Sequence, residues 1–277
     1  MPEPAAAYGR LQDWRALVTG AGSQGDGVGT GRAISVLFAR EGARLALLDR
    51  DVERAAATQA MIAERGGEAR VFPADLTQPT EAAAAVAQAL AWLGGLDVLV
   101  NNLGLGSGGA RLEEMADAAW AQGLDLNLNS AVFVTRAAIA ALLAGQGKAV
   151  VNIASVAGLR AHGVGAYGPA KAALIQFTRE LAVMYGPQGL RANAIAPGHI
   201  LTPLVERFAG PAARETRRRI APLEIEGDAW DVAQAALFLA GPEARFITGA
   251  CLPVDGGVTA IAPLAAYERL AGESATR

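Results

Sequence analysis

Three residues in the second half of the chain have the types and spacing needed to move a proton to and from an alcohol oxygen. Tyr167 and Lys171 are four residues apart, so on a helix their side chains share one face. A tyrosine with its ordinary pKa of about 10 is almost fully protonated near neutrality, and a nearby ammonium group is expected to lower that pKa. Ser155 supplies a hydroxyl that can stabilise an alkoxide or a carbonyl oxygen. The set predicts an oxidoreductase that interconverts a secondary alcohol and a ketone.

Asn127 is a fourth catalytic candidate. It lies inside a long predicted helix, where asparagine is mildly unfavourable, so we expect it to hold a water that links Lys171 to solvent. A serine hydrolase is the rival interpretation, but Ser155 lacks the flanking glycines of a nucleophile elbow. His162 and His199 are the only histidines, and neither has neighbours that could complete a metal site, so no metal is expected.

Short apolar runs alternate with alanine-rich helical stretches, which is the pattern of a parallel sheet with crossover helices. The predicted strands span residues 16–19, 44–48, 69–72, 98–101, 149–153, 191–195 and 251–254. The predicted helices span residues 31–41, 52–65, 79–93, 113–143, 166–185 and 229–240. We therefore expect one doubly wound α/β domain over residues 1–277, with a mostly parallel seven-stranded sheet and helices on both faces. Its core should span residues 15–257, with a small irregular lid at about 199–227.

The composition excludes several classes of function. Hydrophobic residues make up 52% of the 277 residues, so a large core can be buried, and the net charge of −3 leaves no basic footprint for nucleic acid or anionic membranes. Cys251 is the only cysteine, which fits a reducing compartment. We see no leader pattern and no apolar stretch near the roughly 20 residues that span a bilayer, so a cytoplasmic protein without a membrane partner is expected.

A glycine-rich turn follows the first predicted strand and leads into the first helix. Its glycines at 20, 22, 29 and 31 would let backbone amides approach a pyrophosphate at the helix N-terminus, which predicts a Rossmann-type dinucleotide site. Asp49 closes the second strand, where a carboxylate accepts hydrogen bonds from the adenosine ribose and repels a 2′-phosphate. NAD is therefore favoured over NADP, although the adjacent Arg50 could receive that phosphate.

Taken in order, these segments resemble the short-chain dehydrogenase/reductase family from about residue 15 to residue 257. The resemblance rests on the glycine turn, Asp75-Leu76, Asn101-Asn102-Leu103-Gly104, Asn127, Ser155, Tyr167-Gly168-Pro169-Ala170-Lys171, Pro197-Gly198 with Thr202, and Val254-Asp255-Gly256-Gly257. It implies that Ser155, Tyr167 and Lys171 are catalytic, and it adds further cofactor contacts. These are Asp75 and Leu76 at the adenine, Asn102, Gly104, Tyr167, Lys171, Pro197 and Gly198 along the cofactor, and Thr202 at the nicotinamide carboxamide.

The chain departs from the family pattern in two places. The turn is longer than the usual fingerprint by about five residues, at positions 23–28, so Gly22 and Gly27 compete with Gly29 for contact with phosphate. Leu103 replaces the usual alanine after the two asparagines, which enlarges an apolar side chain near the cofactor.

The substrate pocket should be bounded by the loops after the fourth and fifth strands and by the lid. Its candidate residues are Leu105, Val156, Arg160, His162, His199 and Leu204, which suggest a small or mid-sized, largely apolar substrate. Two alternatives remain, namely an epimerase or dehydratase that retains its nucleotide, and a nucleotide-binding protein without turnover. The family resemblance implies a homotetramer, with a homodimer as the other possibility.

Overall fold

The computed structural model describes residues 9–25, 27–106 and 111–271. Its centre is a seven-stranded sheet in the order β3-β2-β1-β4-β5-β6-β9, and every pairing within that sheet is parallel. The strands are β1 (Arg15–Thr19), β2 (Arg44–Asp49), β3 (Ala69–Pro73), β4 (Val98–Asn101), β5 (Ala149–Ile153), β6 (Arg191–Pro197) and β9 (Cys251–Val254). The predicted doubly wound α/β fold is confirmed.

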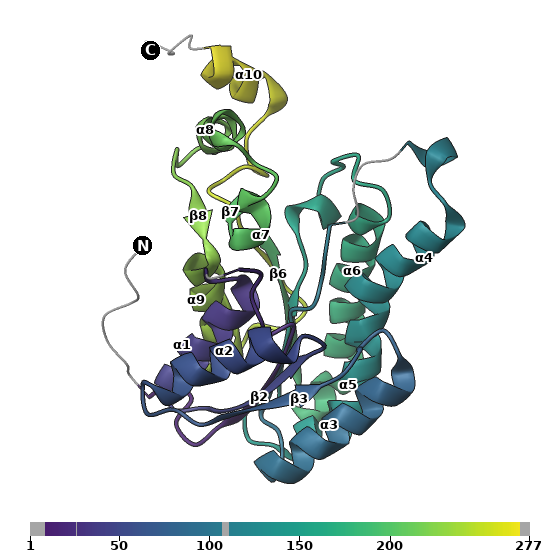
Figure 1. Cartoon of the computed structure of the whole chain (residues 1–277), viewed down its shortest axis with the longest axis vertical. Coiled ribbons are helices and arrows are strands. Elements are labelled where there is room, and N and C mark those ends of the chain that lie inside the picture. Colours follow the sequence, from purple (N-terminus) through teal and green to yellow (C-terminus); the bar gives the residue numbers. More distant parts are fainter. Residues whose placement is uncertain (1–8, 26, 107–110, 272–277) are drawn as a thin grey trace.

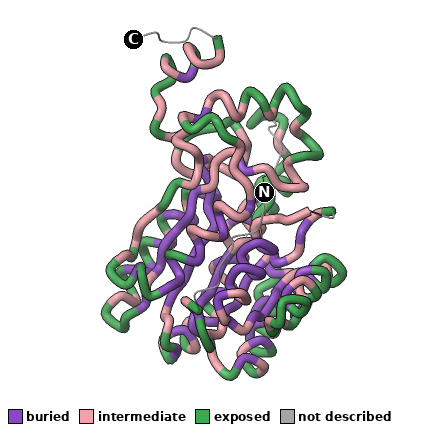
Figure 2. Tube along the Cα trace, turned by 90° about the vertical axis from the view of Figure 1, so that its left-hand side faces the viewer, coloured by how far each residue is buried: buried purple, intermediate pink, exposed green. Residues whose placement is uncertain are grey.

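Helices cover both faces of the sheet (Figure 1). One face carries α1 (Thr30–Arg40), α2 (Val52–Ala63) and α9 (Ala229–Ala240), and the other carries α3 (Pro79–Leu93), α5 (Ser130–Ala144) and α6 (Tyr167–Tyr185). Within β1, Val18 packs into the first layer and Leu17 into the second. The strands are therefore largely apolar on both sides, because alternate side chains enter two separate cores. Figure 2 shows the buried residues concentrated in this sandwich.

The segment expected to be one helix from residue 113 to residue 143 has several parts. A 3-10 turn (Leu112–Glu114) precedes α4 (Asp117–Leu124), a π-helical stretch (Asp125–Asn129) follows, and α5 continues from there. The helix starts at Asp117 because Met115 and Ala116 have extended backbone angles. A π turn adds a residue to the helical repeat, so it changes which side chains face inward around Asn127.

The combined helix Asp117–Ala144 corrects the expectation about apolar length. It has 28 residues and a mean hydropathy of 1.5 in its most apolar window, so by length and composition alone it could cross a membrane. Only 39% of that window is buried inside the chain. Core helices of soluble proteins also meet this criterion, and α5 packs its inner face into the core with Val134 and Leu142.

The segment from 199 to 227, which we call the lid, is more regular than expected. It contains β7 (Ile200–Leu201), α7 (Pro203–Glu206) and α8 (Pro211–Ile220), and it ends at β8 (Gly227–Asp228), which pairs with β7 in parallel. Thr202 and Pro203 mark the start of α7 as its cap and first residue. The sequence prediction also missed α10 (Pro263–Ala271), which stands beside α8 at the upper end of the molecule (Figure 1). An ion pair of 2.8 Å between Arg269 and Glu224 joins α10 to the lid.

Candidate active site

A cavity of about 490 Å³ opens at the carboxyl ends of the central strands, where the chain order reverses between β1 and β4. Ligands of open α/β sheets bind in the crevice outside such a reversal. Every residue predicted to contact the cofactor lines this cavity. They are Gly20, Gly22, Gly29, Gly31, Asp49, Asp75, Leu76, Asn102, Gly104, Tyr167, Lys171, Pro197, Gly198 and Thr202.

Two glycines of the first turn are required by the backbone itself. Gly20 has φ +61°, a conformation that side-chain-bearing residues rarely adopt. A Cβ on Gly31 would clash with the carbonyl oxygen of Gly20 and lie 2.5 Å from the Asn102 amide nitrogen. Gly20 therefore makes the tight turn, and Gly31 allows α1 to pack closely against the strand ends.

The other candidate glycines differ in what they face. The Gly29 amide donates to Ser23 Oγ at 2.9 Å, and the Gly22 amide donates to Asp49 Oδ2 at 2.9 Å. Gly27 does not line the cavity, and a Cβ there would clash with Cγ of Pro203 in the lid. Gly22 and Gly29 line the cavity with their amides bonded within the chain, while Gly27 packs on the lid.

The start of α1 is suited to an anion. None of the described side chains caps this helix end, and its first turn holds no acidic residue. Thr30 and Gly31 of that turn line the cavity. Since the N-terminus of a helix carries partial positive charge, the residues present fit a pyrophosphate.

Asp49 and Asp75 bound the far end of the cavity. The oxygens of Asp49 accept from the amides of Gly22 and Asp51, each at about 3 Å, which fixes the carboxylate against the glycine turn. Asp75 accepts from the Thr77 hydroxyl at 2.7 Å and from the Thr77 amide at 3.0 Å, and these bonds lower its pKa. Both carboxylates retain lone pairs for hydroxyl or amine donors of a ligand.

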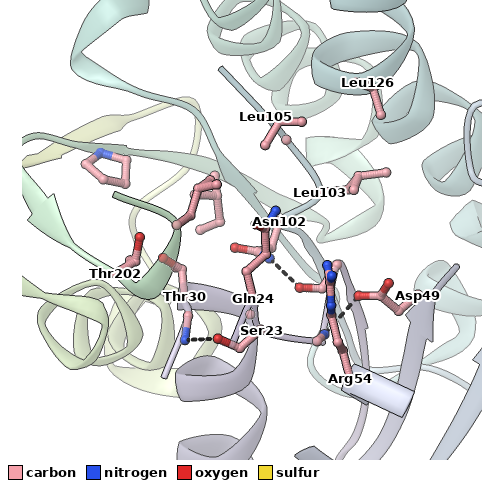
Figure 3. Close-up of a pocket in the computed structure, with 18 of the residues that line it drawn as sticks. Ser23, Gln24, Thr30, Asp49, Arg54, Asn102, Leu103, Leu105, Leu126 and Thr202 are labelled. Carbon is pink, nitrogen blue, oxygen red and sulfur yellow. Dashed lines mark hydrogen bonds between the residues drawn. The ribbon is translucent and has the colours of Figure 1, made fainter. Parts of the chain in front are cut away.

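Asn102 connects the two strands that flank the reversal. Its side-chain amide donates to the carbonyl oxygens of Thr19 at 3.1 Å and Gly20 at 2.9 Å, while its backbone amide donates to Thr19 Oγ1 at 3.0 Å. In Figure 3, Leu103, Leu105 and Leu126 gather above Asn102, and Asp49 and Arg54 lie below it. Asn102 therefore lies between the apolar part of the cavity, lined by the three leucines, and its charged part, lined by Asp49 and Arg54.

Lys171 lies at the other end, almost completely buried. Its Nζ donates to the carbonyl oxygen of Ile153 at 2.9 Å and lies 5.7 Å from the centroid of the Tyr167 ring. Burial lowers the pKa of Lys171 to about 7, because the interior disfavours the charged form. The side chain can therefore both hold and release a proton near neutrality.

Tyr167 and Ser155 meet beside this lysine. Burial raises the pKa of the Tyr167 hydroxyl, and its hydrogen bond with Ser155 opposes that shift. The direction is opposite to the lowering expected from the Tyr-Lys spacing, because burial outweighs any stabilisation of the phenolate. The Ser155 Oγ also accepts from the Ala157 amide at 3.1 Å, which fixes the hydroxyl at the end of β5.

Asn127 lies behind the cavity wall and does not line it. Its side-chain amide donates to the carbonyl oxygens of Leu105 and Gly123, and its Oδ1 accepts from the Leu105 amide. A Cβ on Gly104 would lie 2.7 Å from Lys171 Nζ and 2.9 Å from Asn127 Oδ1. The asparagine therefore holds the loop after β4 against Lys171, and a Cβ at Gly104 would force the ends of these two side chains to move.

Only some of the predicted substrate residues lie at the cavity. Leu105 and Leu204 line the cavity, whereas Val156, Arg160, His162 and His199 do not. Arg160 donates to the Thr259 carbonyl oxygen, and His162 is exposed beside the Arg160 carbonyl oxygen. The His199 ring faces the Arg217 carbonyl oxygen in α8, and burial lowers its pKa.

Sequence reasoning missed several cavity residues, namely Ser23, Gln24, Thr30, Arg54, Leu126, Pro203 and Val205. Pro203 and Val205 could have been inferred from the Thr-Pro start signal of α7. Leu126 could not, because the π-helical stretch that exposes it to the cavity has no comparable signal in the sequence.

Comparisons with known proteins agree with this geometry. A family model described as enoyl-(acyl carrier protein) reductase matches residues 25–259. The chain is 36% identical to 2-(S)-hydroxypropyl-CoM dehydrogenase 3 of Xanthobacter autotrophicus, over 86% of this chain and 95% of that protein. It is 33% identical to cyclohexanol dehydrogenase of an Acinetobacter strain, over 88% of this chain and 94% of that protein.

A solved structure of a short-chain dehydrogenase/reductase from Burkholderia xenovorans superposes with a TM-score of 0.85 at 40% identity. The match covers 91% of this chain and 99% of that one. The chain therefore belongs to the short-chain dehydrogenase/reductase family.

Proposed function

We propose that this chain is an NAD-dependent oxidoreductase that interconverts a secondary alcohol and a ketone on a small or mid-sized, largely apolar substrate. The observation that carries the proposal is the shared cavity. Ser155, Tyr167 and Lys171 line one end of it, while the glycine turn and Asp49 line the other. A dinucleotide laid along the cavity would bring its nicotinamide to the proton-transfer residues.

When bound, the dinucleotide supplies the hydride acceptor or donor. Ser155 donates a hydrogen bond to the substrate oxygen and orients it toward Tyr167. Tyr167 takes the hydroxyl proton during oxidation and returns it during reduction. Lys171, with a pKa lowered to about 7, is placed to exchange a proton beside Tyr167. Asn127 holds Gly104 and Leu105 against Lys171 and thus fixes the wall of the site.

The preference for NAD rests on Asp49. Its carboxylate is held at the cavity by two backbone amides, where it can accept from ribose hydroxyls and repel a 2′-phosphate. Arg50 and Arg54 also line this end, and they are the residues that would favour NADP. The Arg54 Nε forms an ion pair with Asp51 at 2.8 Å, which draws its charge toward that carboxylate.

The apolar substrate class rests on the leucines near Ser155. Leu103, Leu105, Leu126 and Leu204 line the cavity, and such walls exclude water and favour hydrocarbon surface. Two relatives are named for oxidation of secondary alcohols, hydroxypropyl-CoM and cyclohexanol. Their names agree with a ketone or secondary alcohol as the reacting group in this chain.

We also propose a homotetramer, with a homodimer as the alternative. The helix Asp117–Ala144 is apolar, and less than half of its most apolar window is buried by its own chain. Cover by the same helix of a second copy would remove that surface from water. Sedimentation of the purified protein distinguishes tetramer, dimer and monomer.

The test of function is to incubate the purified protein with NAD or NADP and a panel of secondary alcohols. Net accumulation of reduced dinucleotide, faster with NAD, supports the proposal. A tightly retained dinucleotide without net reduction supports the epimerase or dehydratase alternative. Binding without any turnover of panel members supports a nucleotide-binding protein.

A further inference from the structure

The lengthened turn after β1, which we call the inserted turn (residues 23–28), is anchored from behind by a buried arginine. Arg32 of α1 is 4% exposed, and its guanidinium donates to the Gly27 carbonyl oxygen at 2.7 Å. The same group donates to Thr58 Oγ1 at 3.0 Å and to the Arg54 carbonyl oxygen at 3.2 Å, both in α2. The described part of the inserted turn is therefore tied to two helices of the core.

The outer side of the inserted turn contacts the lid at both ends of α7. At its first residue, Pro203 packs so closely on Gly27 that a Cβ there would clash with the proline Cγ and lie 3.4 Å from its Cδ. Just beyond its last residue, Arg207 Nη1 donates to Gln24 Oε1 at 3.2 Å. A helix of four residues is not stable on its own, so its position depends on the surface that it packs on.

The two elements also close over the same cavity. Ser23 and Gln24 line it from the inserted turn, and Thr202, Pro203 and Leu204 line it from the lid. In Figure 3, Thr202 lies beside Thr30, with Gln24 and Ser23 further along the same side of the view. A ligand that fills the space between them contacts both elements, so its departure requires the lid and the turn to separate.

We propose that Gly27 and Gln24 are positioning residues that dock α7 on the inserted turn, and that this contact limits the rate at which the dinucleotide leaves. The inference rests on the proposed function, because it takes a dinucleotide as the occupant of the cavity. The insertion thereby gives α7 a contact with the core in addition to its own cap at Thr202. Opening and closing of such lids controls product release in many enzymes.

Gly27→Ala tests this contact, because the added Cβ would meet Cγ of Pro203 in the lid. The added methyl group displaces Pro203, and the dissociation of reduced dinucleotide should become about tenfold faster, a change worth about 1.4 kcal/mol. The rate is measured by stopped-flow displacement. Gly186→Ala is the matched control, since a Cβ there meets nothing within 4 Å.

A second variant shows whether faster release in Gly27→Ala comes from lost docking of α7 or from damage to the inserted turn itself. Pro203→Ala removes the Cγ and Cδ atoms that the new methyl group would strike, so Gly27→Ala combined with Pro203→Ala should release dinucleotide more slowly than Gly27→Ala alone. The KM for dinucleotide should rise in Gly27→Ala, and the unfolding temperature should match that of Gly186→Ala. Gln24→Ala should also make the release of dinucleotide faster, because it removes the hydrogen bond from Arg207.

The outcomes are distinct. Wild-type binding with equal release rates in Gly27→Ala and Gly186→Ala would overturn the docking inference and leave the proposed function intact. Strict additivity of Gly27→Ala and Pro203→Ala would overturn it as well. If the wild-type protein binds no nicotinamide dinucleotide at all, the proposed function fails, and this inference fails with it.

Discussion

Lys171 Nζ lies 2.9 Å from the carbonyl oxygen of Ile153, the last residue of β5. This bond connects α6 to the strand that leads into Ser155, so the lysine and the serine are positioned by the same strand end. The bond also explains how an amine can be buried here, because the backbone carbonyl satisfies one of its donors. Removal of the amine from water still lowers its pKa to about 7.

The lowered pKa of Lys171 predicts a stability that rises with pH. In the unfolded chain the amine stays protonated to about pH 10.4, whereas in the folded chain it loses its proton near pH 7. Between these values the unfolded state binds more protons, so the free energy of unfolding increases with pH. Below about pH 7 both states hold the proton, so Lys171 no longer makes the free energy of unfolding depend on pH.

Urea unfolding of wild type and Lys171→Met, both free of dinucleotide, measures this contribution. The wild-type free energy of unfolding, relative to the variant, should rise by about 1 kcal/mol per pH unit between about pH 7 and pH 10. If the free energy of unfolding of wild type relative to Lys171→Met does not change across this range, Lys171 remains charged in the folded chain.

Tyr167→Phe should abolish most activity and leave the fold intact. The phenyl ring keeps its place beside Lys171, but the proton carrier is lost, so kcat should fall by about a thousandfold. The unfolding temperature should change little, because the variant removes a hydroxyl whose ionisation burial already disfavours. Tyr185→Phe is the control, since Tyr185 packs at the end of α6 outside the cavity. Equal activity of the two variants would remove Tyr167 from the mechanism.

The raised pKa of Tyr167 also predicts the direction of its pH dependence. A protonated tyrosine donates to a ketone, whereas alcohol oxidation needs the phenolate. Alcohol oxidation should therefore accelerate as pH rises above neutrality, and ketone reduction should not. Initial rates in both directions across a pH series measure this, and a shared optimum would contradict it.

Asp49→Asn should weaken discrimination between the two dinucleotides. Gly22 and Asp51 donate to different oxygens of Asp49, so the amide keeps an acceptor for only one of these two backbone donors. It also removes the charge that repels a 2′-phosphate. The KM for NAD should rise about tenfold and the preference over NADP should fall by a similar factor, as expected for the loss of about 1.4 kcal/mol. If kcat/KM with NAD relative to kcat/KM with NADP is the same in Asp49→Asn and in wild type, then Arg50 and Arg54 decide the preference.

Asp97 is a buried acid outside the cavity. Burial alone would raise its pKa, but hydrogen bonds from Arg15 and the Gln146 amide outweigh it and hold the pKa below its ordinary value. Its contribution to stability is present above about pH 4 and is lost as the pH falls through the lowered pKa. Asp97→Asn should cost about 3 kcal/mol at neutral pH, since it leaves Arg15 without its partner.

The control for Asp97→Asn is Glu68→Gln, which breaks an exposed pair with Arg44 and should cost less than about 1 kcal/mol. Urea unfolding gives the free energy of unfolding of Asp97→Asn and of wild type. The difference between these two free energies should become smaller as the pH is lowered. A gap that does not depend on pH would contradict the assignment of Asp97.

The strands and the convergence of residues at the cavity could be predicted from the sequence because they depend on local patterns. Largely apolar runs such as 149–153 are long enough to identify buried strands, and residues at strand ends must meet at one edge of a parallel sheet. This is why Gly20, Asn102 and Ser155 converge in the structure as the sequence indicated.

The lid and the substrate wall could not be predicted in the same way. Their positions depend on contacts between distant segments, such as Pro203 with Gly27, that leave no periodic pattern. His199 comes two residues after the end of β6 at Pro197, yet its ring turns to the Arg217 carbonyl oxygen instead of the cavity. The shift in the Tyr167 pKa was also unpredictable, because spacing to Lys171 indicates a neighbour but not the extent of burial.

The most direct test of the account follows an isotope. A secondary alcohol that the wild type oxidises is labelled with deuterium at the carbinol carbon, and the reduced NAD is examined by mass spectrometry. The account predicts that the deuterium appears in the nicotinamide ring and that Tyr167→Phe forms almost none of this product. Reduced dinucleotide without the label, or label transfer that is equal in Tyr167→Phe, would contradict it.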